Sequence, residues 1–146
     1  GFMKKIMIVC STSFYNYVDE INNKLKEYGY DTVLPNCYDA PVTNEDNKKF
    51  SEEEYYKFFK EMYEESREKV STIDAILVLN FDKEKNNVIH KNYIGASTFL
   101  EMYEAFMQKK KIFILNSLPD SSNMLLDEIK GFNPIILNGN LDKIKE

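Results

Sequence analysis

Short, continuous apolar runs constrain the fold of this chain most strongly. Residues 5–10 (KIMIVC), 75–80 (AILVLN) and 112–116 (IFILN) show no alternation of polar and apolar side chains. Strands buried on both faces, as in a parallel sheet, have this pattern, whereas a strand with one solvated face alternates. Residues 31–35 and 134–137 fit two shorter strands. The sequence therefore predicts a five-stranded parallel sheet.

Segments with helical periodicity separate these runs. We expect helices over residues 17–28, 51–70 and 97–109, a shorter one over 121–129, and a last turn over 141–145. The second helix begins with Ser-Glu-Glu-Glu, which has the form of a capping box. Strands alternating with helices predict an α/β fold, a flavodoxin-like or Rossmann-like three-layer sandwich with strand order 2-1-3-4-5.

Length and composition bound the class of protein. At 146 residues, 43% hydrophobic and 29% charged, the chain fits one globular domain over residues 3–146. Gly1 and Phe2 are interpreted as a vector-derived remnant before Met3. The net charge of −5 gives no general attraction to nucleic acid or to an anionic membrane. No apolar run approaches the roughly 18–20 residues that span a bilayer. We therefore expect a cytoplasmic protein with neither nucleic-acid nor membrane partners.

Cysteine and histidine are scarce. Cys10 and Cys37 are the only cysteines and form no CxxC motif, which favours reduced thiols in the cytosol over a disulfide or a metal site. His90 is the only histidine, so neither a His-based catalytic triad nor a multi-histidine metal site is expected. No metal and no cofactor is predicted.

Three segments are expected to meet at one edge of the sheet. Open α/β sheets bind ligands outside the carboxyl ends of their strands, and residues 11–13, 80–82 and 95–101 all reach that edge. The hydroxyls of the first segment suit a phosphate or sugar oxygen, although helix capping by Ser13 explains them equally well. A flavodoxin-like phosphate loop is similar in composition, but this segment contains no glycine.

Glu101 has two interpretations. On a helical wheel it falls with Glu104 and Gln108, opposite a wide apolar arc, so periodicity alone predicts a solvated residue. Its expected place in the first turn, beside the edge of the sheet, favours a functional acid that the helix dipole keeps ionised. The apolar arc comprises Phe99, Leu100, Met102, Tyr103, Phe106 and Met107, and it suggests a homodimer through this helix.

Four stretches of the chain resemble a known family. They are residues 74–80 (DAILVLN), 93–102 (YIGASTFLEM), 111–116 (KIFILN) and 133–139 (NPIILNG). Together they resemble the nucleoside 2-deoxyribosyltransferase-like proteins, which include deoxynucleoside 5′-monophosphate N-glycosidases. The resemblance implies that Glu101 is the nucleophile, which attacks the anomeric carbon and releases the base through a covalent glycosyl intermediate.

The resemblance also implies a set of supporting residues. Asp82 is the expected second catalytic acid. The residues expected to bind substrate are Ser11, Thr12, Ser13, Asn80, Gly95, Ser97, Thr98, Asn116 and Ser117. Asn80 stands where transferases carry an aspartate, and Tyr103 replaces a glycine and would crowd the sugar. The family's acid at the end of the second helix has three candidate counterparts, namely Glu64, Glu65 and Glu68.

Three functions remain in view. The first is N-glycosidic cleavage of, or (deoxy)ribosyl transfer from, a nucleoside or nucleoside 5′-monophosphate. The second is a non-catalytic nucleotide-binding or regulatory module, favoured by Tyr103, Asn80 and Gly95. The third is a structural interaction protein, which the apolar arc would suit.

Overall fold

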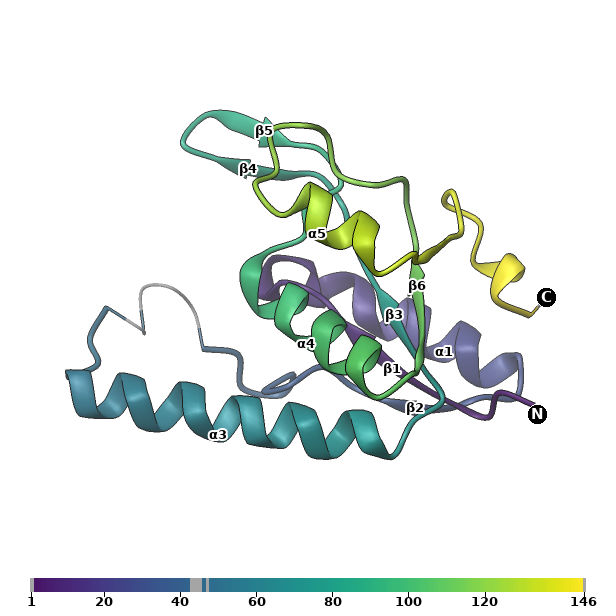
Figure 1. The fold of residues 1–146 in the computed structure, drawn as a ribbon, viewed down its shortest axis with the longest axis horizontal. Helices are drawn as coiled ribbons and strands as arrows, with labels where there is room; N and C mark the ends of the chain where they lie inside the picture. The colour runs from purple at the N-terminus through teal and green to yellow at the C-terminus, as the bar shows by residue number, and fades with distance from the viewer. Residues whose placement is uncertain (1, 43–45, 47, 146) are drawn as a thin grey trace.

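The computed structural model describes residues 2–42, 46 and 48–145. Its centre is a parallel sheet whose strand order is β2-β1-β3-β6-β7. The five strands are β1 (Lys5–Val9), β2 (Asp31–Val33), β3 (Ala75–Val78), β6 (Lys111–Ile114) and β7 (Ile135–Ile136). Counted along the chain within this sheet, the order is 2-1-3-4-5, so the predicted topology is confirmed (Figure 1).

Helices cover both faces of the sheet. Alternate residues of the buried strands point to opposite sides, and each side has its own core. Ile6 and Ile8 pack with α1 (Val18–Glu27) and η2 (Leu141–Lys145) on one face. Met7 and Val9 pack on the other, with α3 (Glu52–Ser71), α4 (Ala96–Met107) and α5 (Leu126–Gly131). The result is the expected flavodoxin-like three-layer sandwich.

Helix α3 is much longer than the strands it covers. Its 20 residues span about 30 Å, whereas the five residues of β1 span about 17 Å. Only Ser66 and Val70 of this helix are buried, both near its C-terminal end. The N-terminal part projects beyond the helices beside it (Figure 1). The predicted capping box is present, since the Ser51 hydroxyl accepts from the Glu54 N–H and the Glu54 carboxylate accepts from the Ser51 N–H.

The structure differs from the predicted elements in three places. Residues 81–92, for which no strand was predicted, contain an antiparallel hairpin of β4 (Lys83–Lys85) and β5 (Val88–His90). Asn86 and Asn87 form its turn with φ of 52° and 62°, values that asparagine tolerates well. The first helix is preceded by a 3₁₀ segment, η1 (Thr12–Tyr17), and α5 begins at Leu126 rather than near residue 121.

Residues 36–50 connect the segments predicted as the second strand and the second helix. Of that stretch, residues 43–45 and 47 lie outside the described part of the chain. Its first residue, Asn36, is buried. No helix among the described residues combines the length and apolarity needed to cross a bilayer.

Candidate active site

Glu101 faces inward, contrary to the helical-wheel prediction. The buried side of α4 comprises Thr98, Met102 and Ala105, and Glu101 lies next to them on the wheel. Its Oε2 is buried and has no hydrogen-bond partner among the described residues. The prediction of a solvated Glu101 is wrong because only part of the apolar arc of α4 faces the core. Met102 is buried, whereas Leu100, Tyr103, Phe106 and Met107 are 41–57% exposed.

Glu101 also lies deeper in α4 than expected. The helix begins at Ala96, with Gly95 as its N-cap, so Glu101 is in the second turn. Helix-dipole stabilisation of a negative charge falls off within the first turn. The expectation that the dipole keeps Glu101 ionised is therefore not supported by its position. Tyr103 projects from the opposite side of the helix and is 48% exposed, so within this chain it does not crowd Glu101.

A polar network beside Glu101 is centred on Asn36. The Tyr15 hydroxyl donates to the Asn36 carbonyl at 2.7 Å, and the Asn36 amide donates to the Ser66 hydroxyl at 2.7 Å. Lys69 Nζ donates to Asn36 Oδ1 at 2.8 Å and pairs with Glu65 Oε1 at 2.9 Å. The connection after β2 thus joins η1 to α3. We call Tyr15, Asn36, Glu65, Ser66 and Lys69 the Asn36 network.

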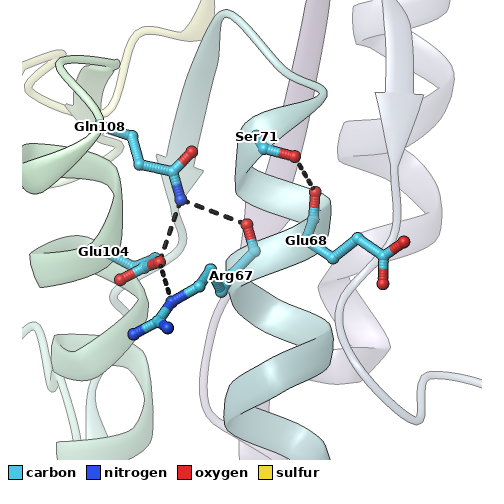
Figure 2. Close-up of polar contacts among 5 residues, drawn as sticks. All are labelled: Arg67, Glu68, Ser71, Glu104 and Gln108. Carbon is cyan, nitrogen blue, oxygen red and sulfur yellow. Dashed lines mark hydrogen bonds and ion pairs between the residues drawn. The ribbon is translucent and has the colours of Figure 1, made fainter.

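The alignment of α3 with α4 brings this network to Glu101. Arg67 Nε contacts Glu104 Oε1 at 2.9 Å, and the Gln108 amide donates to both Glu104 and the Arg67 carbonyl (Figure 2). Glu104 is the less exposed partner, with 18% of its side chain accessible against 78% for Arg67. We call this contact the Arg67–Glu104 staple. It joins α3 to α4, and the charges of Glu65 and Lys69 on α3 act on the pKa of Glu101 on α4.

The electrostatics of Glu101 reflect this placement. Burial raises the pKa of its carboxyl group from 4.5 to about 8; the positive charge of Lys69 opposes the rise and the negative charge of Glu65 adds to it. Burial, with a smaller contribution from Glu101, raises the pKa of the Cys10 thiol to about 12. Burial, followed by the charges of Cys10, Glu101 and Cys37, raises the pKa of the Tyr15 hydroxyl. Cys10 is therefore an inert thiol rather than a nucleophile.

The loops expected to approach a sugar or phosphate lie at the carboxyl edge. Ser11, not Ser13, is the N-cap of η1 and accepts from the Ser13 N–H at 3.3 Å, while Thr12 and Ser13 are exposed. Ser97 is exposed, whereas Thr98 is buried. A Cβ on Gly95 would lie 2.9 Å from the Tyr93 hydroxyl oxygen and 3.2 Å from its ring. A larger residue at this position would therefore displace the Tyr93 side chain.

Asn80 and Asn116 clamp neighbouring strand ends together. Asn80 is fully buried; its Oδ1 accepts from the Asn116 N–H at 2.9 Å and its Nδ2 donates to the Ser117 carbonyl at 2.8 Å. The Asn116 amide returns a bond to the Asn80 carbonyl at 3.0 Å. The side chain of Asn80 is therefore already engaged by the protein. The Ser117 side chain is exposed.

Asp82 lies at the base of the β4–β5 hairpin. Its Oδ1 accepts from the Asn92 N–H at 3.0 Å, and its side chain is exposed. It is not among the charged groups that shift the pKa of Glu101. Of the three acids considered on α3, Glu65 has this influence, while Glu64 pairs with Lys60. Among these acids, Glu65 is therefore the one whose charge acts on the nucleophile candidate.

Sequence reasoning missed Tyr15, Asn36, Ser66 and Lys69. The spacing of Glu65, Ser66 and Lys69 places them on one face of α3 and was a usable signal. Nothing in the sequence pairs that face with Asn36, because the contact depends on the path of an irregular connection.

Two hollows lie away from Glu101. One, of about 460 Å³, runs along the outer side of α3 and is lined by Tyr55, Tyr56, Phe59, Lys60, Tyr63, Glu64 and Arg67. The other, of about 410 Å³, lies on the α1 face between Tyr17, Lys24 and Asn116. Neither is lined by a buried ionisable group. The Glu101 region is the better candidate because a buried acid beside a paired lysine is a costly arrangement that stability alone does not favour.

No cluster of three or more metal-ligating side chains occurs among the described residues. Comparison with family models and with curated proteins gives no match. Among solved structures, the chain is similar to a conserved protein from Enterococcus faecalis V583, with a TM-score of 0.46 and 15% identity, covering 98% of this chain and 85% of that chain. That likeness says nothing about the chemistry of this chain.

Proposed function

We propose that the protein cleaves the N-glycosidic bond of a nucleoside or nucleoside 5′-monophosphate, or transfers the glycosyl group, with Glu101 as the nucleophile. The observation that carries the proposal is the buried, unpartnered Oε2 of Glu101 on the edge-facing helix α4. A carboxylate in such a place is poorly solvated. Once ionised, it suits attack on an anomeric carbon whose transition state carries positive charge.

The raised pKa of Glu101 fits this role on the condition that only the ionised form of the carboxyl group reacts. With a pKa of about 8, about a tenth of Glu101 is ionised at pH 7 in the free protein. The positive charge that develops on the sugar ring stabilises the carboxylate in the transition state. We therefore expect kcat/KM to rise with pH up to about 8, as Glu101 loses its proton.

The proposed reaction has two steps. Glu101 forms a bond to the anomeric carbon while the carbon–nitrogen bond breaks, and the leaving base takes both bonding electrons and accepts a proton from solvent water. Glu65, which is paired with Lys69, stays a charged neighbour of Glu101 throughout. In the second step water, or a second base, attacks the anomeric carbon and frees Glu101. The cytosol, where Cys10 and Cys37 stay unpaired thiols, is the proposed compartment.

Base release tests the proposal directly. Ribo- and deoxynucleosides and their 5′-monophosphates are incubated with the protein, and free base is followed by chromatography. Glu101→Gln should abolish release. Glu101→Ala with added azide should restore it and yield a glycosyl azide, because azide fits the vacated carboxylate position. Glu64→Gln, on the outer side of α3, is the matched control and should retain activity. Absence of release from every substrate, or unchanged release from Glu101→Gln, would refute the proposal.

A non-catalytic nucleotide-binding module is the second candidate. The observation that favours it is the engagement of Asn80 by Asn116 and Ser117, which leaves that side chain without a free group for a base. Calorimetric binding of a nucleotide without base release would support this candidate over the enzyme.

We also propose a homodimer through α4. The exposed side chains Leu100, Tyr103, Phe106 and Met107 form an uncharged stripe. The Phe106 ring packs against the Phe132 ring with centroids 5.5 Å apart, so the stripe continues toward α5. An isologous contact between two copies covers the same stripe on both protomers and needs no partner of different chemistry. A second copy of this chain is therefore the proposed occupant.

A further inference from the structure

Lys69 is the cation of the α3–α4 pair whose position is most restrained. Its Nζ donates to Asn36 Oδ1 at 2.8 Å and to Glu65 Oε1 at 2.9 Å, and only 28% of its side chain is exposed. Arg67 also binds an acid, but 78% of its side chain is exposed. Holding a lysine in this way sacrifices side-chain entropy, and an exposed ion pair returns little free energy. The stability of the Lys69–Glu65 ion pair alone therefore does not explain why Lys69 is held in place.

An ammonium group has three N–H donors, and two of those on Lys69 have acceptors. Glu101 Oε2 is a buried acceptor without a donor, and the positive charge of Lys69 acts on this carboxyl group. Val70 of α3 and Met102 of α4, the chain neighbours of Lys69 and Glu101, belong to the same core. Lys69 therefore has an N–H donor to offer on the helix that packs against α4.

We propose that Lys69 is a positioning residue that supplies the counter-charge for ionised Glu101, and that Asn36 and Glu65 hold its ammonium group between the two acids. The inference rests on the proposed role of Glu101. When Glu101 is protonated, Lys69 pairs with Glu65. When Glu101 ionises, the Lys69 ammonium group pairs with both carboxylates. Once Glu101 is esterified by the sugar, Lys69 pairs with Glu65 alone.

The other groups around Glu101 cannot take this role. Cys10, directly after β1, and Tyr15 of η1 both feel its charge, and each carries a raised pKa, so each is neutral at pH 7. On α4 itself, Glu104 is bound by Arg67. Lys69 is the positive group that opposes the rise in the pKa of Glu101.

Titration of Glu101 tests the inference independently of catalysis. The side-chain carboxyl carbons of glutamate are labelled with ¹³C and followed by NMR from pH 5 to 10, and the Glu101 signal is the one absent from Glu101→Gln. Lys69→Met should move the midpoint upward by about 1 pH unit or more, because an opposite charge a few ångströms away lowers a carboxyl pKa by about that amount. Lys69→Arg should restore most of the wild-type midpoint.

Two further variants test the direction of the midpoint shift and provide a control for the loss of a lysine from α3. Glu65→Gln should move the midpoint downward, since it removes a like charge and releases Lys69; Glu65 is half exposed, so this variant should fold even if Lys69→Met does not. Lys60→Met removes a lysine from the same helix, where it pairs with Glu64 at 3.9 Å, and should leave the midpoint unchanged.

The outcomes separate this inference from the proposed function. An unchanged Glu101 midpoint in both Lys69→Met and Glu65→Gln overturns the inference, even if base release is found. Midpoints that move in opposite directions support it, even if no nucleoside is cleaved. If base is released, Lys69→Met should shift the acidic limb of the kcat/KM profile to higher pH. The kcat/KM of this variant should approach the wild-type value near pH 10. A loss that is equal at every pH would indicate a merely structural role and would count against the inference.

Discussion

Replacing Glu101 should stabilise the protein at alkaline pH. Its pKa is about 8 in the folded chain and 4.5 in the reference state, so the folded protein holds a proton that the unfolded chain has released between these values. The free energy of unfolding therefore falls as pH rises through this window. The difference between 4.5 and about 8, at about 1.4 kcal/mol per pH unit, corresponds to about 5 kcal/mol above pH 8 and about 3 kcal/mol at pH 7.

Glutamine resembles the protonated acid and does not titrate. Glu101→Gln should therefore match wild type near pH 5 and exceed its free energy of unfolding progressively from pH 5 to 8. Urea denaturation at pH 5, 7 and 9 measures both proteins, and m-values should agree. Glu64→Gln is the control, since 66% of that side chain is exposed, and it should change the free energy of unfolding little throughout.

Parallel stability curves for wild type and Glu101→Gln would refute the reasoning. They would mean that water or a shift of α4 solvates the carboxylate. A difference that grows with pH would instead show that the fold tolerates an unfavourable charge at this position, as expected of a functional residue.

Three other substitutions test separate parts of the structure. Asn80→Ala should lower the free energy of unfolding by about 2–4 kcal/mol, because it removes the hydrogen bonds to Ser117 and Asn116 and leaves buried polar groups without partners. Urea denaturation measures this change, and a loss below about 1 kcal/mol would contradict the role of Asn80 in joining the strand ends. Arg67→Ala should cost about 1 kcal/mol or less, since that side chain is mostly exposed, and a larger loss would show that the staple carries more of the α3–α4 contact. Phe106→Glu should convert a dimer into a monomer by size-exclusion chromatography with light scattering; a monomeric wild type would exclude the dimer.

The sheet was predictable because its strands are buried on both faces. Residues 5–9 and 75–78 pack against helices on two sides, so almost every side chain must be apolar, and the sequence pattern follows directly. The β4–β5 hairpin was not predictable from the same signal. Its strands are three residues each and mostly exposed, so no burial constrains their composition.

The candidate site was predictable only in part. Connectivity alone brings the ends of β1 and β3 and the start of α4 to one edge, but it did not show that Glu101 lies in the second turn of α4 with a buried carboxyl oxygen. The Asn36 network depends on how an irregular connection folds back onto α3, and no periodicity records that. Asp82 was selected by its distance along the chain from Asn80, whereas the charge of Glu65 acts on Glu101 from a different helix, which contacts α4 through Arg67 and Glu104.

Helix α4 shows why the wheel failed for Glu101. A surface helix usually turns its most apolar arc to the core, and that rule assumes that burial in the monomer is the only demand on the sequence. Here the sheet-facing side carries Thr98 and Glu101, while Phe106 and Met107 remain exposed. In a monomer, both the inward-facing acid and the exposed apolar side chains would lower the free energy of unfolding without a compensating contact. A reactive acid accounts for the first and an isologous contact for the second, so both follow if α4 forms a site on its inner face and an interface on its outer one.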